Sequence, residues 1–289
     1  MKVGFIGLGN MGGPMAANLA AAGHAVAGFD TAAAMPDGVT AAASAAEAAR
    51  GAEVVVTMLP DGRILRAVAA DVIPAMAEGA VLLDCSTVDV ESARSVAAAA
   101  AERGVAALDA PVSGGTGGAR AGTLTFMVGG PAEALAIAAP LLDVMGGRTV
   151  HCGAAGAGQA AKICNNMMLG ATMAVTCEAF ALADRLGLER QALFDVASTS
   201  SGQSWSLTTY CPAAGVGPRS PADDGYRPGF AAELMLKDLG LAMQAAEASG
   251  AQVPVGAEAH GRYAAFVEAG GRGRDFSALL PRLAGEDEA

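Results

Sequence analysis

The chain has 289 residues, of which 53% are hydrophobic and 16% charged, and its formal net charge is −11. These values are typical of a globular protein with a large core and room for two domains, and they exclude a disordered chain. The negative charge excludes nucleic acid and anionic membrane surfaces as favoured partners, whereas small anionic ligands can still bind at local lysines and arginines.

The cysteines are odd in number, scattered and without CxxC spacing, which argues against a disulfide framework or a structural zinc site. The histidines are also far apart, so we expect no metal site and a reducing, cytoplasmic location. Residues 1–22 superficially resemble a signal peptide, but their glycines have another explanation, and no stretch has the roughly 18 uninterrupted apolar residues of a membrane span. These cysteines and histidines are Cys85, Cys152, Cys164, Cys177, Cys211, His24, His151 and His260.

The first predicted strand, Lys2–Ile6, is followed by the run Gly7-Leu8-Gly9-Asn10-Met11-Gly12, by a helix to about Ala22 and by a second strand, His24–Phe29. A G-x-G-x-x-G pattern between a strand and a helix is typical of dinucleotide-binding folds. We expect Gly7 to permit a tight turn, Gly9 to admit a pyrophosphate and Gly12 to let helix and strand pack closely.

Asp30 directly follows the second predicted strand. An acidic side chain at this place binds the ribose hydroxyls of NAD and repels the 2′-phosphate of NADP. Because Thr31 rather than an arginine follows, the sequence predicts NAD as the cofactor. The alternative is that Asp30 only forms a turn.

Strand and helix patterns then alternate, which predicts a parallel, doubly wound sheet of the Rossmann type. Ligands of such sheets bind at the carboxyl ends of the strands, where Met58-Leu59-Pro60, Cys85-Ser86-Thr87 and Pro111–Gly115 lie. In the last of these, Ser113, Gly114 and Gly115 offer a hydroxyl and open amides for a carboxylate, although a glycine-rich stretch can also be a flexible loop. The predicted strands are Glu53–Leu59, Ala80–Asp84, Val105–Ala110, Leu124–Val128 and Arg148–Cys152, with helices such as Ser92–Arg103 and Pro131–Met145 between them.

A long helix is predicted to begin near Gly158 and to end near Leu186. Its residues Lys162, Asn165 and Asn166 share one face, and since the surrounding residues are apolar or small, we expect the helix to be buried nearly all round. Apolar surroundings and the helix dipole would lower the pKa of Lys162 enough for proton exchange near neutral pH. The alternatives are a solvated surface lysine and an amide pair that bonds neighbouring backbone.

The helix also marks the predicted domain boundary, with a dinucleotide-binding domain at 1–157 and an all-helical domain at 158–289. An irregular connection from Gln203 to Pro228 includes Trp205, and its length favours a functional or interfacial role. Beyond it, Lys237 could meet a bound anion or form an ordinary surface pair with Asp238. The helical segments predicted in this half are Thr172–Leu186, which is the second part of the long helix, and Arg190–Ser198, Ala231–Ser249, Val255–Glu268 and Phe276–Leu283.

These motifs, taken in order, resemble the β-hydroxyacid dehydrogenase family from end to end, and most closely its 3-hydroxyisobutyrate branch. The resemblance rests on the glycine turn from Gly7 to Gly12, on Asp109–Gly115, on the helix with Lys162 and Asn166, and on Lys237-Asp238-Leu239. The branch is indicated by Ser204-Trp205-Ser206, Tyr210, Pro212, Gly215, Val216, Tyr226, Gly229-Phe230 and Leu236.

The resemblance implies roles for individual residues. Lys162 is the implied general acid and base, and Lys237 is expected near both nicotinamide and substrate. The implied substrate-binding residues are Ser113, Gly114, Gly115, Asn165, Asn166 and Lys237. The implied NAD-binding residues are Gly7, Leu8, Gly9, Asn10, Met11, Gly12, Asp30, Met58, Leu59, Pro60, Thr87, Phe230 and Lys237.

The implied reaction is the NAD-dependent oxidation of 3-hydroxyisobutyrate to methylmalonate semialdehyde, a step of valine catabolism. One alternative is another short β-hydroxyacid, or a semialdehyde such as tartronate or succinic semialdehyde. A non-catalytic dinucleotide-binding regulator is a second alternative, but it has no need for Lys162, Asn166 and Lys237 together. Because the helical half is small and its long helix is apolar, we also expect a homodimer or homotetramer.

Overall fold

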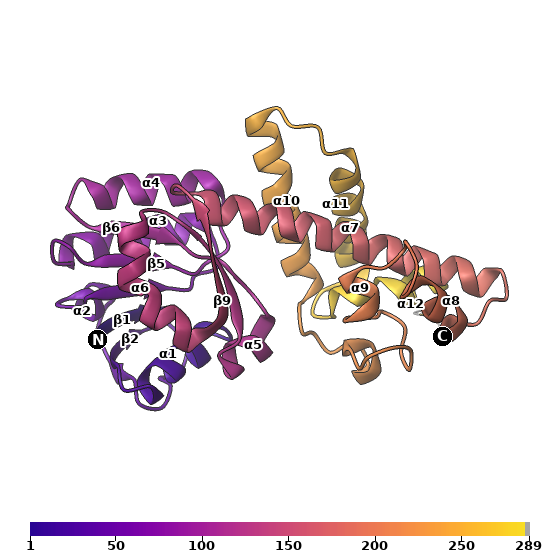
Figure 1. Cartoon of the computed structure of the whole chain (residues 1–289), viewed down its shortest axis with the longest axis horizontal. Coiled ribbons are helices and arrows are strands. Elements are labelled where there is room, and N and C mark those ends of the chain that lie inside the picture. The colour runs from indigo at the N-terminus through magenta and orange to yellow at the C-terminus, as the bar shows by residue number, and fades with distance from the viewer. Residues whose placement is uncertain (287–289) are drawn as a thin grey trace. The chain divides into compact units, whose positions relative to one another are not determined.

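The computed structural model describes residues 1–286. The chain forms two units, Met1–Lys162 and Ile163–Ala289, and the division between them lies inside helix α7, Ala157–Arg185. The first unit contains the sheet and the second is helical, so the predicted order of a Rossmann-type domain and a helical domain is confirmed (Figure 1).

The sheet of the first unit has the strand order β3-β2-β1-β4-β5-β6-β8-β7, and β9 pairs with β8. The first strand, β1, lies between β2 and β4, so the chain changes direction across the sheet at the glycine turn that follows β1. Such a switch point is where doubly wound sheets bind their ligands. The strands are β1 Lys2–Ile6, β2 Ala25–Phe29, β3 Thr40–Ala41, β4 Val54–Thr57, β5 Val81–Asp84, β6 Ala106–Asp109, β7 Val112–Ser113, β8 Leu124–Gly129 and β9 Gly146–Gly153.

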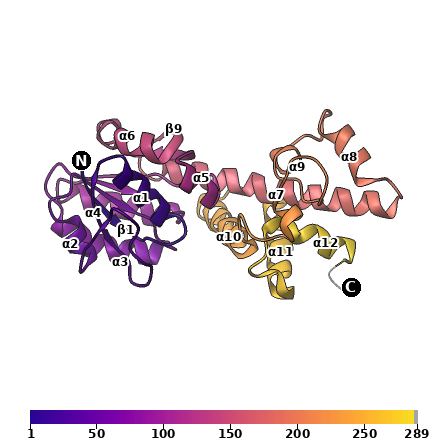
Figure 2. The same ribbon diagram turned by 90° about the horizontal axis from the view of Figure 1, so that it is seen from below.

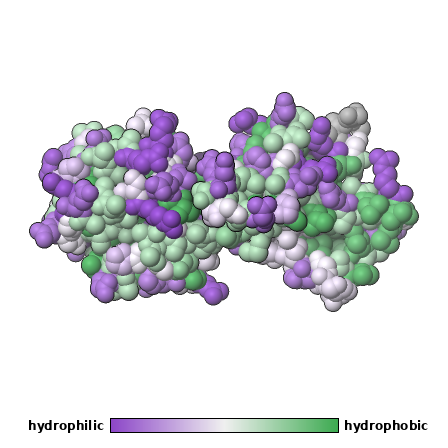
Figure 3. Space-filling view, turned by 90° about the horizontal axis from the view of Figure 1, so that it is seen from above, coloured by the Kyte–Doolittle hydropathy of each residue, from purple (hydrophilic) through white to green (hydrophobic). Residues whose placement is uncertain are grey.

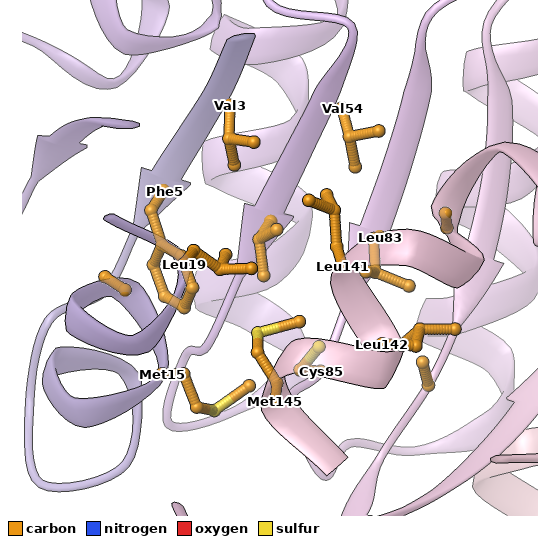
Figure 4. Packing of buried hydrophobic residues seen from close by; sticks show 14 of the residues in the cluster. Val3, Phe5, Met15, Leu19, Val54, Leu83, Cys85, Leu141, Leu142 and Met145 are labelled. Atoms are coloured by element: carbon orange, nitrogen blue, oxygen red, sulfur yellow. The ribbon is translucent and has the colours of Figure 1, made fainter. Parts of the chain in front are cut away.

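The central strands are buried on both faces because successive side chains point to opposite sides of a nearly all-apolar run. Val3 and Phe5 of β1 pack under helices α1, Gly12–Ala21, and α6, Ala132–Met145 (Figure 4). The alternate residues of the central strands, such as Ile6, Val55 and Leu82, point to the other face of the sheet and belong to a second core cluster. Four helical elements contribute to that second cluster: α2 Ala45–Ala49, α3 Gly62–Val72, the short η1 Ile73–Ala75 and α4 Val90–Ala101.

The prediction of an entirely parallel sheet is wrong at β8, which pairs antiparallel with β6 and β7. The reason is the connection after β6, which holds only β7 and the short helix α5, Gly115–Ala121, instead of a full crossover helix. The glycine-rich stretch is therefore a short strand and a helix, and the alternative of a flexible loop is wrong.

The second unit consists of helices around one apolar core (Figure 2). Met173, Cys177 and Phe180 of α7 pack there with Met235 and Tyr263. The other helices are α8 Arg190–Ala197, α9 Trp205–Thr208, η2 Pro221–Asp224, α10 Ala232–Ser249, α11 Pro254–Phe266, the π-turn η3 Val267–Gly271, η4 Phe276–Ala278 and α12 Leu279–Ala284.

The connection between α8 and α10 is more ordered than predicted, since it contains α9 and η2. The buried carboxylate of Asp275 holds its end in place. One carboxylate oxygen, Oδ2, accepts hydrogen bonds from the Tyr210 hydroxyl at 2.9 Å and from the backbone amides of Gly229 and Phe230 at 2.9 and 3.0 Å. Tyr210 in turn stacks on Trp205 at a ring separation of 5.0 Å.

Helix α7 is not buried nearly all round, which corrects the prediction. Within its own chain it exposes a stripe formed by Met168 (60%), Val175 (58%) and Leu182 (60%), and Leu186 (75%) directly follows the end of the helix. Its length and the mean hydropathy of 1.3 over its most apolar 18 residues would also suit a membrane span. However, 44% of these 18 residues are buried inside the protein. The buried side supplies core residues of the second unit, so we interpret α7 as a core helix with one uncovered face.

Candidate active site

The glycine turn after β1 is shaped by two close approaches. A side chain on Gly7, which has φ 92°, would overlap the carbonyl oxygen of Met58, and one on Gly12 would overlap the carbonyl oxygen of Gly7. A Cβ atom on Gly9 would meet nothing within 4 Å. The turn therefore requires glycine at two positions for the fold, and it leaves open space at the third, beside the N-terminus of α1.

Asp30 follows β2 and closes the same turn. Its Oδ2 accepts a hydrogen bond from the Leu8 amide at 2.7 Å, and its Oδ1 accepts from the amides of Ala32 and Ala33, both at 2.8 Å. Burial by itself would raise the pKa of this carboxyl, but the surrounding backbone amides lower it, and the net shift is downwards. Asp30 therefore forms a turn, and its carboxylate is ionised at neutral pH.

The loops after β4 and β5 are joined through one buried carboxyl group. Asp84 Oδ1 accepts hydrogen bonds from the hydroxyls of Thr57 at 2.7 Å and Ser86 at 2.5 Å. The Ser86 hydroxyl oxygen accepts from the Leu59 amide at 2.8 Å. The Met58-Leu59-Pro60 turn, which is predicted to bind NAD, therefore lies beside the loop that contains Thr87, the other predicted NAD contact in this part of the sheet.

Burial raises the pKa of Asp84 to about 6, although the hydrogen bonds from Ser86 and Thr57 act in the opposite direction, while the charge of Asp109 adds to the rise. Its Oδ2 is buried and has no hydrogen-bond partner among residues 1–286. The sequence did not predict a role for this carboxyl. Its partner Ser86 is only two residues away, but its other partner, Thr57, is 27 residues away and comes close only through the pairing of β4 with β5.

Asp84→Asn is expected to change how stability depends on pH. The folded pKa of about 6 exceeds the unfolded value of 3.8, so the wild type loses stability as pH rises between the two values, by about 3 kcal/mol in total. The asparagine variant lacks this loss. The difference between its free energy of unfolding and that of the wild type should therefore rise by about 3 kcal/mol from about pH 4 to pH 7, in favour of the variant, as measured by urea titrations. A difference that stays constant with pH would contradict the burial argument.

Ser113, Gly114 and Gly115 lie where β7 passes into α5. Gly114 has φ 134° and Gly115 has φ 60°, which are conformations that favour glycine. The Asn18 side-chain amide on α1 donates a hydrogen bond to the Ala119 carbonyl at 2.9 Å, so α5 is fastened to the helix that follows the glycine turn.

The start of α7 is attached to the sheet by Asp109, the last residue of β6. Its carboxylate accepts hydrogen bonds from the amides of Gly156 at 2.7 Å and Gln159 at 2.8 Å, and burial raises its pKa against these bonds. Lys162, one turn further along, is 7% exposed. The predicted burial of this lysine is confirmed, and the interpretation as a solvated surface lysine is wrong.

In the second unit, Asn166 donates a hydrogen bond from Nδ2 to Asp238 Oδ2 at 2.6 Å and accepts one from Asn165 Nδ2 at 3.0 Å. The alternative that these amides bond only neighbouring backbone is therefore wrong. Asp238 is 4% exposed, with its Oδ1 at 3.4 Å from Lys237 Nζ, so the pair is not an ordinary surface pair. The spacing of Asp238 from the apolar Met235 and Ala242 on α10 could have predicted its burial.

Phe230 precedes α10, and its ring packs edge-on against Phe276 at 5.6 Å. This contact belongs to the core of the second unit and is independent of any cofactor. The glycine turn, Asp30, the 58–60 turn, Thr87, Ser113–Gly115 and Lys162 belong to the first unit, and Asn165, Asn166, Phe230 and Lys237 belong to the second. No group of three or more His, Cys, Asp or Glu side chains that could hold a metal ion occurs within the described part of the chain.

Two family models match the chain. Residues 2–153 match the NAD-binding domain of 6-phosphogluconate dehydrogenase, and residues 156–283 match the NAD-binding domain of NADP-dependent 3-hydroxyisobutyrate dehydrogenase. Together these models cover nearly the whole described chain, in the order of the two units.

Relatives align along their full length. The 3-hydroxyisobutyrate dehydrogenase of Pseudomonas aeruginosa is 48% identical and covers 99% of both chains, and a NAD-dependent L-serine dehydrogenase of the same organism is 48% identical over 96% of both. The solved structure of Mycobacterium tuberculosis 3-hydroxyisobutyrate dehydrogenase with L-serine is 49% identical, with a TM-score of 0.94 over 97% of this chain and 98% of that one. The chain therefore belongs to the 3-hydroxyisobutyrate dehydrogenase family and is a NAD-binding oxidoreductase.

Proposed function

We propose that this protein oxidises 3-hydroxyisobutyrate to methylmalonate semialdehyde with NAD, and that Lys162 is the general base. The observation that carries the proposal is the burial of Lys162 on the first turns of α7, which Asp109 holds against the carboxyl edge of a dinucleotide-binding sheet. Lysines are rarely buried this deeply, and a buried titratable side chain at the ligand-binding edge of a sheet is a candidate for catalysis.

In the proposed mechanism, the neutral amine of Lys162 removes the proton of the substrate hydroxyl. NAD, when bound, accepts the hydride from the carbinol carbon. The Ser113 hydroxyl and the amides of Gly114 and Gly115 bind the substrate carboxylate. Asn166, held at 2.6 Å by Asp238, presents its amide to the substrate. Asn165 is hydrogen-bonded to Asn166, and Lys237 pairs with Asp238, so we assign both to the same part of the substrate site.

L-serine is the second candidate substrate, because one close relative is a NAD-dependent L-serine dehydrogenase and a solved relative contains L-serine. Serine shares the carboxylate and the β-hydroxyl of 3-hydroxyisobutyrate, but it carries an ammonium group in place of the methyl group. A site that binds the methyl group in an apolar environment would disfavour that charge.

The test is a panel of 3-hydroxyisobutyrate, L-serine, other short β-hydroxyacids and, in the reductive direction, tartronate and succinic semialdehydes. We expect the highest kcat/KM for 3-hydroxyisobutyrate. A kcat/KM for L-serine about tenfold higher would transfer the assignment to serine, and the absence of turnover with every compound would favour a dinucleotide-binding regulator.

We expect NAD to be preferred over NADP because the ionised carboxylate of Asp30 would repel a 2′-phosphate. Asp30→Asn removes this charge and should lower the ratio of kcat/KM for NAD to kcat/KM for NADP by about tenfold or more. Both cofactors are measured with the same variant, so any loss of folded protein cancels in the ratio. A wild-type enzyme that prefers NADP would contradict the assignment.

We further propose that the chain is a homo-oligomer in which the exposed stripe of α7 meets a second copy. Met168, Val175 and Leu182 recur every seven residues, and each is at least 58% exposed. Apolar side chains gather visibly on the surface of the second unit (Figure 3). A heptad-spaced apolar stripe is self-complementary about a two-fold axis and is costly to leave in water.

Val175→Glu is expected to weaken this association, because it places a charge in the centre of the stripe. Light scattering during size-exclusion chromatography should show a dimer or tetramer for the wild type and a smaller species for the variant. Val255→Glu on α11 is the matched control, since Val255 is also exposed (71%) but lies outside the stripe. A monomeric wild type at micromolar concentration would overturn the proposal.

We propose a cytoplasmic location, supported by the five cysteines, all of which are free thiols. We also propose a functional boundary at 157/158, in the first turn of α7, so that the sheet and the glycine turn lie before it.

A further inference from the structure

Gln159 is fully buried in the first turn of α7, and its side chain bonds to a loop more than 70 residues earlier in the chain. Its Nε2 donates to the Ser86 carbonyl at 2.8 Å, and its Oε1 accepts from the Val88 amide at 3.1 Å. One amide therefore bonds to the backbone on both sides of Thr87, the residue predicted to contact NAD.

The loop that Gln159 holds is itself part of a wider network. The Ser86 hydroxyl donates to Asp84 and accepts from the Leu59 amide, so the 58–60 turn is attached to the same loop. The backbone amide of Gln159 donates to Asp109, which fixes the start of α7 on β6. Gln159 is thus the residue through which both cofactor loops are joined to the helix.

Lys162 follows Gln159 by three residues on this helix. Side chains at that spacing lie on the same face and are separated by about 4.5 Å along the axis. The rotation and height of the first turn therefore determine where the amine of Lys162 lies relative to the loop. A side chain on Gly158 would overlap the carbonyls of Met127 and Asp109, so the backbone of this turn already lies close against the sheet.

We propose that Gln159 is a positioning residue that couples the placement of the Ser86–Val88 loop to the placement of the Lys162 amine. It does not touch the substrate, and the proposal rests on the proposed function of Lys162. Loss of either hydrogen bond of the Gln159 side chain allows the helix turn and the loop to shift independently. A displacement of about 1 Å between a reacting group and its partner can cost about a hundredfold in rate.

Gln159→Met keeps the length of the side chain and removes both hydrogen bonds. We expect kcat to fall about tenfold to a hundredfold, while KM for the hydroxyacid changes less than about threefold, because the groups that bind its carboxylate are untouched. A merely structural role would lower the thermal stability of the variant and leave kcat per folded molecule unchanged.

Gln159→Glu gives the more discriminating test. When protonated, the new carboxyl can still donate to the Ser86 carbonyl and accept from Val88, whereas the ionised form cannot donate. Burial and the carboxyls of Asp84 and Asp109 raise its pKa, and Lys162 lowers it only when its amine is protonated. We expect the ratio of variant kcat to wild-type kcat to rise at least threefold as pH falls from about 8 to about 6. A flat ratio overturns the proposal.

Gln191→Glu, on the exposed helix α8, is the matched control because its amide also makes a hydrogen bond, to Asp195 at 2.8 Å. Its kcat ratio to wild type should stay near one at every pH. Lys162→Ala separates this proposal from the proposed function. If Lys162→Ala loses turnover and Gln159→Met does not, only the coupling is rejected, whereas an active Lys162→Ala rejects the function on which it rests.

Discussion

Lys162→Ala is expected to lower kcat with 3-hydroxyisobutyrate by about 10² to 10⁴ while the variant still binds NAD. General-base catalysis contributes a factor of this size, and the alanine removes the only group we assign to proton removal. The glycine turn and Asp30 remain intact, so titration of NAD should give an affinity close to that of the wild type. Steady-state kinetics and NAD titration on the same preparation give both quantities.

Lys162→Arg sharpens this prediction. Arginine keeps the positive charge and much of the volume, but it does not deprotonate in proteins, so it should be as inactive as alanine. Lys2→Ala is the control, since the chain has only three lysines and Lys2 lies at the exposed start of β1. Substantial kcat in either Lys162 variant would show that another group removes the proton.

Gly12→Ala is expected to destabilise the free protein, whereas Gly9→Ala is not. The added methyl group at Gly12 overlaps the Gly7 carbonyl and lies 3.0 Å from Phe5 Cε1, so α1 must move away from β1. Forcing a methyl group into such packing costs about 3 kcal/mol, which lowers Tm by about 10 °C in a protein of this size. Thermal unfolding without ligand measures the effect.

Gly9→Ala differs because its Cβ meets no protein atom within 4 Å. Its Tm without ligand should therefore stay within about 1 °C of the wild type. The methyl group would instead occupy the space where a pyrophosphate approaches the turn, so NAD affinity should fall more than about tenfold. Unchanged NAD affinity would place the pyrophosphate elsewhere.

The features that were predictable from the sequence are those encoded by neighbouring residues. The strand–turn–helix from Lys2 to Ala21, the position of Asp30 and the buried Lys162 follow from periodicity and glycine spacing. The reversed direction of β8 was not predictable, because it depends on the length of the connection after β6. The apolar composition of α7 does not predict which of its faces is covered, because that depends on how the helix packs against the rest of the protein.

The hydrogen-bond network beneath the predicted site could not be found by pattern. Gln159 reaches Ser86 and Asp109 across 73 and 50 residues, and Asn166 reaches Asp238 across 72. Within its own segment, the spacing of each of these side chains from neighbouring residues does not indicate its distant partner. The pairing of β5 with β6, which aligns Asp84 with Asp109, and the contact of the first turn of α7 with β6 bring the partners of Gln159 together. The packing of α7 against α10 brings Asn166 to Asp238.

Helix α5 has three glycines among its seven residues, and each costs about 1 kcal/mol of helix stability relative to alanine. Its order therefore depends on outside contacts, such as the bond from Asn18 to Ala119. Segments of this kind open locally at a free energy well below that of global unfolding. Amide hydrogens of residues 115–121 should consequently exchange with deuterium before those of the central strands, and an acid bound at Ser113 would slow that exchange.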